Sequence, residues 1–86
     1  MKWRLSNGNS DIAIEETRIG GGYIRSVIRL TNSVTGELLA IGQLDHRKGR
    51  RHLKFDMVDF IGGKITADIY YRNASRDKMQ VKIVCV

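Results

Sequence analysis

The sequence has few of the residues that build disulfide scaffolds, kinked helices or membrane spans. It holds one cysteine, so no disulfide can form within the chain, and no proline, so kinked helices and polyproline segments are excluded. No apolar run approaches the roughly 18 residues of a membrane-spanning helix, and no charged-then-apolar signal sequence opens the chain. We therefore expect a cytoplasmic domain without a membrane span.

Residues that favour helices are also scarce. The chain of 86 residues has only four Ala and three Glu, against ten Ile, six Val and four Thr. These β-branched residues favour strands. A chain of this length supports one small core, and its hydrophobic content of 42% is that of an ordinary globular protein. The composition predicts a single all-β domain over residues 1–86.

Seven segments alternate between apolar and polar residues, as strands with one buried face do. The connections between them are short and contain most of the glycines, which suits hairpins. The predicted strands are 1–6, 12–19, 23–31, 37–45, 52–61, 64–72 and 79–86. The segment 12–19 fits a short N-terminal helix as an alternative, beginning after a cap at Ser10 or Asp11.

The alternation also predicts a register. Leu30 is expected opposite Leu38, and Leu44 opposite Leu53, which sets Gly42 beside Phe55 and gives its ring room. The last hairpin is expected to pair Tyr71 with Met79, Ile69 with Val81, Ala67 with Ile83 and Ile65 with Cys85. Each of these pairs places apolar side chains on one face.

One connection breaks the pattern. A two-residue turn at 62–63 would pair Phe60 with the inward Ile65, and would so place an even-numbered residue on the inner face. The inward residues up to Met57 occupy odd positions. A β-bulge at Val58 or Asp59 would reconcile the two and bend the sheet. With no helix to cover an open sheet, we predict a small antiparallel barrel or two-layer sandwich of six to seven strands.

The positive charge is concentrated in the connection 46–52. Its formal charge is +4, against +6 for the whole chain. Arginine forks and lysines held along a ribbon can bind phosphates, and exposed aromatic rings can stack on bases. The candidate phosphate-binding residues are Arg47, Lys48, Arg50 and Arg51 in this loop, and Arg25, Arg29 and Lys54 on the neighbouring strands. The candidates for stacking are Tyr23, Tyr70 and Trp3.

Other roles fit the same loop. It also suits a solvated hairpin tip that protects a sheet edge, or a surface that docks an acidic protein. A third hypothesis is a small ribonuclease-like enzyme with His46 and His52 as acid and base. A flexible tip holds catalytic groups poorly, so we prefer a non-catalytic domain over an enzyme. Of the two non-catalytic roles, we prefer a domain that binds nucleic acid, DNA or RNA, over a protein-interaction module.

Metal and cofactor sites have little support. One cysteine and two histidines make no zinc site, and Cys85 is predicted to be a buried apolar side chain. The glycines at 20–22 lack the lysine and helix start of a phosphate-binding loop, so we expect no cofactor.

An apolar patch is predicted on the outer face of the sheet, formed by Val27, Leu39 and Ile41. Cover could come from the N-terminal strand, through Trp3 and Leu5, or from a second copy of the chain in a homodimer.

Overall fold

The computed structural model describes residues 2–7, 10–59 and 62–85, and the side chains of 10–59 and 62–84. The described residues form seven strands and no helix. The strands are β1 (Lys2–Asn7), β2 (Ser10–Gly20), β3 (Tyr23–Asn32), β4 (Leu38–Arg47), β5 (His52–Asp59), β6 (Lys64–Tyr71) and β7 (Met79–Cys85). The all-β prediction is confirmed. The helix alternative for 12–19 is wrong, because this segment lies in β2 and pairs with β1 and β3.

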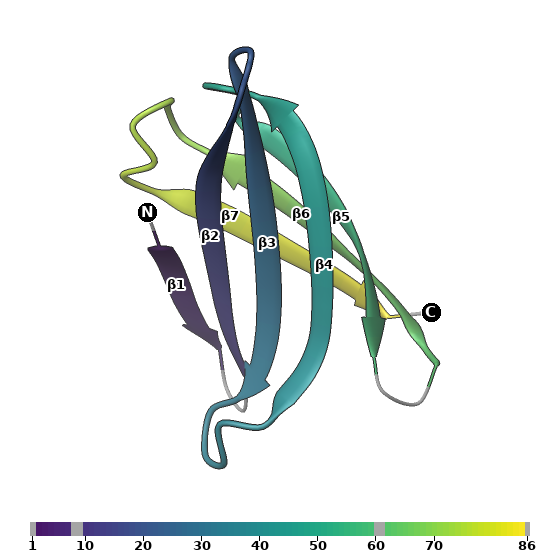
Figure 1. Cartoon of the computed structure of the whole chain (residues 1–86). Helices are drawn as coiled ribbons and strands as arrows, with labels where there is room; N and C mark the ends of the chain where they lie inside the picture. Colours follow the sequence, from purple (N-terminus) through teal and green to yellow (C-terminus); the bar gives the residue numbers. More distant parts are fainter. Residues whose placement is uncertain (1, 8–9, 60–61, 86) are drawn as a thin grey trace.

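The strands form one antiparallel sheet in which each strand pairs with its neighbour in sequence, from β1 at one edge to β7 at the other. β4 and β5 pair through only three residue pairs, Ala40–Asp59, Ile41–Val58 and Gly42–Met57. Beyond this short ladder the two strands diverge, so β5–β7 cross the layer of β1–β4 obliquely (Figure 1). The sheet therefore curls into a half-barrel, consistent with the small barrel-like fold that was predicted.

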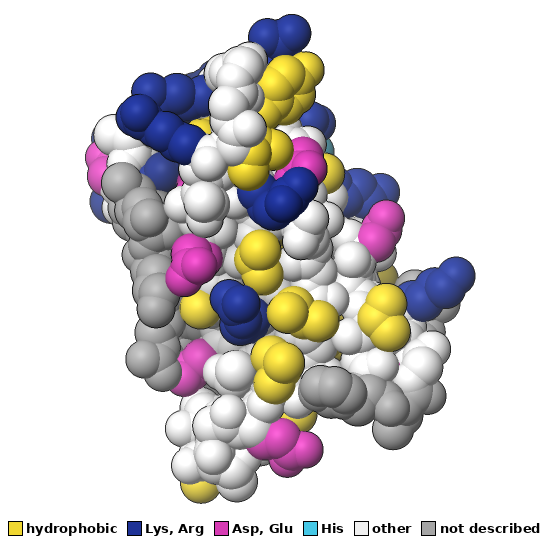
Figure 2. Space-filling model, viewed as in Figure 1, with side chains coloured by type: hydrophobic (Ala, Val, Ile, Leu, Met, Phe, Trp, Pro, Cys, Tyr) yellow, Lys and Arg dark blue, Asp and Glu magenta, His cyan; other side chains and the backbone are white. Residues whose placement is uncertain are grey.

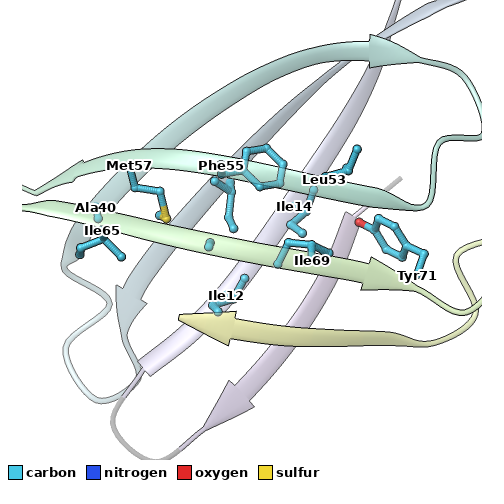
Figure 3. Close-up of a cluster of buried hydrophobic side chains, with 11 residues drawn as sticks. Ile12, Ile14, Ala40, Leu53, Phe55, Met57, Ile65, Ile69 and Tyr71 are labelled. Carbon is cyan, nitrogen blue, oxygen red and sulfur yellow. The ribbon is translucent and has the colours of Figure 1, made fainter. Parts of the chain in front are cut away.

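The core lies between the two halves of the curled sheet. The side chains of Ile14, Ile28, Leu53, Phe55 and Ile69 are fully buried there. Figure 3 shows Phe55 of β5 among aliphatic side chains from β2 and β6. These residues occupy alternate positions on their strands, as the period-two pattern predicted.

The predicted register is confirmed at the last hairpin and wrong in the middle of the sheet. In β6 and β7 every predicted pair is present, including the backbone pairing of Ile65 with Cys85. In contrast, Leu30 lies opposite Ala40 rather than Leu38, and the ladder is irregular between Leu30 and Thr31. Over most of the ladder, the observed partners differ from the predicted ones by two residues. A displacement of two residues changes the pairing but leaves the same side chains on the inner face.

The displacement changes the reason for a glycine at position 42. Gly42 lies opposite Ile28 and Met57, not beside Phe55. A Cβ atom there would approach the backbone oxygen of Asp56 to 3.0 Å and the Cγ of Met57 to 3.0 Å. Gly42 therefore lets β4 and β5 meet closely at the point where the sheet turns over.

The predicted β-bulge at Val58 or Asp59 is also wrong. β5 and β6 pair without interruption from His52–Tyr70 to Val58–Lys64. The inward parity is kept because the ladder runs in one register to Val58–Lys64, and a 3.2 Å hydrogen bond from the Asp59 amide to the Gly63 carbonyl follows it.

Some predictions fall outside the described part of the structure. Phe60, whose inward position motivated the bulge, is among them. So are the side chains of Trp3, Leu5 and Cys85.

Candidate functional site at the three-loop end

Three connections meet at one end of the half-barrel. In an antiparallel sheet of consecutive strands, alternate connections lie at the same end, here those between β2 and β3, β4 and β5, and β6 and β7 (Figure 1). The Lys48 amide donates to the Gly22 carbonyl at 2.8 Å, which ties the first two together. The Tyr71 amide donates to the Arg51 carbonyl at 2.8 Å, which ties the second to the third. We call residues 18–23, 47–52 and 72–78 the loop end.

The loop end carries the positive charge of the molecule. It holds eight of the 15 Lys and Arg residues and one of the nine Asp and Glu residues, a formal charge of +7 where the whole chain has +6. The remaining residues therefore sum to a charge of −1. In Figure 2 dark blue side chains gather at the upper end, where Figure 1 places the β2–β3 connection. The fold thus separates charge more strongly than the sequence suggests.

The four predicted loop cations all lie at this end and are exposed: Arg47, Lys48, Arg50 and Arg51. The structure adds cations that the prediction left out of the site. They are Arg18 from β2, and Arg72, Arg76 and Lys78 from the β6–β7 connection. All of these except Arg76 are exposed.

The three predicted strand cations do not join this group. Arg25 is bound to Asp45 through Nε and Nη2, at 2.9 and 3.0 Å. This hydrogen-bonded pair raises the pKa of Arg25 and lowers the pKa of Asp45, so a carboxylate already neutralises this guanidinium. Arg29 is half-buried in the middle of β3, and Lys54 is exposed on β5 opposite Asp68.

Two predicted aromatic side chains border the loop end. The Tyr23 ring is 41% exposed, with the Arg47 guanidinium 5.2 Å from its centroid. Tyr70 is 50% exposed and stacks on the His52 ring, with centroids 4.0 Å apart and an interplanar angle of 7°. Tyr70, Arg72 and Lys78 line one pocket of about 370 Å³. Aromatic surface and exposed cations therefore adjoin each other here.

His46 was expected in an exposed loop, and this is wrong. It lies on the inner face of β4, only 2% exposed, with Nε2 2.6 Å from the Ser26 hydroxyl and Nδ1 2.8 Å from the Arg47 carbonyl. Because a carbonyl oxygen only accepts, Nδ1 carries a hydrogen and donates it to Arg47, while Nε2 shares a hydrogen bond with the Ser26 hydroxyl. His52 lies on the outer face of β5, so the structure does not bring the two histidines together as an acid–base pair.

Beneath the loops, Arg76 closes the end of the core. Its side chain is 4% exposed, its Nε donates to the Glu16 carboxylate at 3.0 Å, and its guanidinium lies 4.0 Å from the Tyr71 ring centroid. Burial, together with the nearby Glu16 charge, raises the pKa of the Tyr71 hydroxyl. Arg76 has a φ of 63°, an unusual conformation for a residue with a side chain, which its buried contacts hold in place.

The predicted outer apolar patch is arranged differently. Val27 lies opposite Gln43 rather than Ile41, and both Val27 and Leu39 are half-buried. Ile41 lies opposite Val58, and these two are 41% and 61% exposed. β1 extends the sheet beside β2 and does not pair over this face.

The remaining features to consider are metal binding, membrane-spanning helices and similarity to known proteins. Within residues 10–59 and 62–84, no three His, Cys, Asp or Glu side chains gather closely enough to hold a metal ion. The described residues contain no helix with the length and apolar character needed to cross a membrane. No protein-family model, curated protein or solved structure matches the chain.

Proposed function

We propose that this protein is a non-catalytic nucleic-acid-binding domain whose loop end contacts the phosphate backbone. One observation carries the proposal: the fold gathers a formal charge of +7 at one end of a chain whose other residues sum to −1. Exposed cations gathered in this way attract a polyanion and release its condensed counterions on binding.

The kinds of residue at this end support a phosphate ligand. Five of its eight cations are the exposed arginines Arg18, Arg47, Arg50, Arg51 and Arg72. A guanidinium binds two phosphate oxygens in a fork, and it is less tightly hydrated than an ammonium group. Tyr23 and the Tyr70–His52 stack add aromatic faces beside these arginines, which suits stacking on unpaired bases.

The first experiment is a titration of labelled single- and double-stranded oligonucleotides by fluorescence anisotropy, repeated across salt concentrations. The native protein should bind at low salt, with an affinity that falls linearly on a log–log plot against salt. In the loop variant R47Q/K48Q/R50Q/R51Q the slope should be shallower by up to roughly 2.8 on single strands and 3.6 on duplex. All four side chains are exposed, so the variant should fold.

A second pair of variants separates stacking from charge. Tyr23→Ala and Tyr70→Ala should weaken single-strand binding by about 1–3 kcal/mol at each base contact and leave the salt slope unchanged, because stacking releases no ions. If the native protein binds no oligonucleotide at low salt, the proposal fails, and an acidic protein becomes the leading partner for the loop end.

A further inference from the structure

A basic pocket lies at the loop end, where β2 and β3 adjoin the β4–β5 and β6–β7 connections. Its volume is about 280 Å³, and its wall includes Arg18 from β2, Lys48 and Gly49 from the β4–β5 connection, and Arg76 from the β6–β7 connection. A second pocket of about 200 Å³ shares Arg18 and Lys48 with it and extends to Tyr23. The two pockets are therefore neighbours that share part of their walls, with Arg76 lining the first and the exposed Tyr23 ring lining the second.

The charges of the first pocket are only partly matched within the protein. Arg18 and Lys48 are exposed, and no ion pair joins either to a carboxylate in the described part of the chain. Arg76 is paired with Glu16 through Nε, but its buried Nη1 has no hydrogen-bond partner among the described atoms. With Glu16 counted, the formal charge of the pocket is +2.

We infer that this pocket receives the terminal phosphate of a nucleic-acid strand, an inference that rests on the proposed function. A phosphate monoester at a strand end carries a charge of about −1.5 to −2 near neutral pH, and so complements the pocket charge. A phosphodiester within a strand carries only one negative charge and has a nucleoside on each side.

The size of the pocket agrees with a strand end. Pockets for drug-sized ligands have volumes of roughly 300–1,000 Å³, so a pocket of about 280 Å³ lies at the lower end of this range and is too small for a run of nucleotides. The nucleic-acid strand would continue from the terminal phosphate into the adjoining pocket, which Tyr23 lines. The exposed Tyr23 ring can stack on the terminal base.

The test compares one single-stranded oligonucleotide with three ends: a 5′-phosphate, a 3′-phosphate, and hydroxyls at both ends. The native protein should bind one phosphate-ended strand about tenfold more tightly than the hydroxyl-ended strand. The pocket variant R18Q/K48Q should reduce this ratio to about one. The control variant R50Q/R51Q removes two cations of the same loop end that line neither pocket. It should weaken binding to all three strands and keep the ratio.

Each outcome decides the inference. If the native protein binds the three strands with equal affinity, the inference is overturned and the proposed function stands. The same holds if the pocket variant and the control variant lose the preference for the phosphate-ended strand equally. Binding of a free nucleoside monophosphate as tightly as the phosphate-ended strand also overturns it, because the ligand is then the nucleotide alone. If no strand binds, the proposed function fails. An NMR titration with inorganic phosphate then shows whether the Lys48 and Gly49 amides shift, and unshifted amides reject a phosphate site altogether.

Discussion

The buried ion pair of Arg76 and Glu16 gives the sharpest prediction about stability. Replacing Arg76 with Leu removes the cation. Because both residues have a side chain, the backbone strain at a φ of 63° is common to the native protein and the variant. The Glu16 carboxylate, only 13% exposed, is left without its partner. Breaking a buried pair from one side costs about 3–5 kcal/mol, and the remaining exposure of Glu16 favours the lower end.

Urea unfolding, followed by circular dichroism, measures this effect. With a slope of about 1 kcal/mol per molar urea for a small domain, the midpoint should fall by roughly 3 M. The double variant Glu16→Gln/Arg76→Leu leaves no charge at this site and should recover part of the loss. An unchanged midpoint in Arg76→Leu, or a double variant no more stable than the single one, would refute this account of how the core is closed.

Three further predictions concern the core, the bend and the surface ion pair. Phe55→Ala should lower the free energy of unfolding by about 3–5 kcal/mol, because the ring is fully buried, and a small urea shift would contradict its place in the core. Gly42→Ala should cost about 1–3 kcal/mol in the same assay, because the new methyl group would meet backbone and side-chain atoms 3.0 Å away. Asp45→Asn should free Arg25 and steepen the salt slope of nucleic-acid binding by up to about 0.9 on duplex, whereas an unchanged slope would exclude Arg25 from the interface. In the native protein, NMR should show the Asp45 carboxyl titrating below its usual range and returning to it in Arg25→Gln. Since the folded-state pKa is lowered, the pair's stabilisation is present above the unfolded pKa of about 3.9 and is lost as pH falls through the folded pKa.

The alternation of residue types predicts which side chains face the core, but not which residues pair. Period two places Leu53, Phe55 and Met57 inward wherever the ladder begins, and the structure agrees. The partners depend on how many residues each connection uses. The shift between Leu30 and Thr31 leaves no mark in the strand pattern.

The position of His46 could have been predicted. The inward residues of β4 occupy even positions, from Ala40 to Leu44, so the same parity continues to His46. Its neighbours in a run of cations indicated a solvated loop instead. The parity of the strand was the better guide, because β4 continues to Arg47.

The full loop end required the order of the strands. Arg18 lies near the end of β2, whereas Lys48 and Arg76 lie in two different connections, and the order of consecutive antiparallel strands brings these three segments to one end. The burial of Arg76 depends on Glu16, which lies 60 residues away in the sequence. Nothing in the local sequence of the β6–β7 connection indicates this pairing.

The central claim is that the placement of charge at the loop end, rather than the net charge, binds the phosphate backbone. Two variants with the same formal charge test it. R47Q/K48Q/R50Q/R51Q removes four loop-end cations, and R29Q/K54Q/K64Q/K82Q removes four from the strands, each lowering the charge from +6 to +2. The measurement is the salt slope of single-strand affinity. We predict a slope shallower by up to roughly 2.8 in the first variant and close to the native value in the second. Equal slopes in the two variants would contradict the claim.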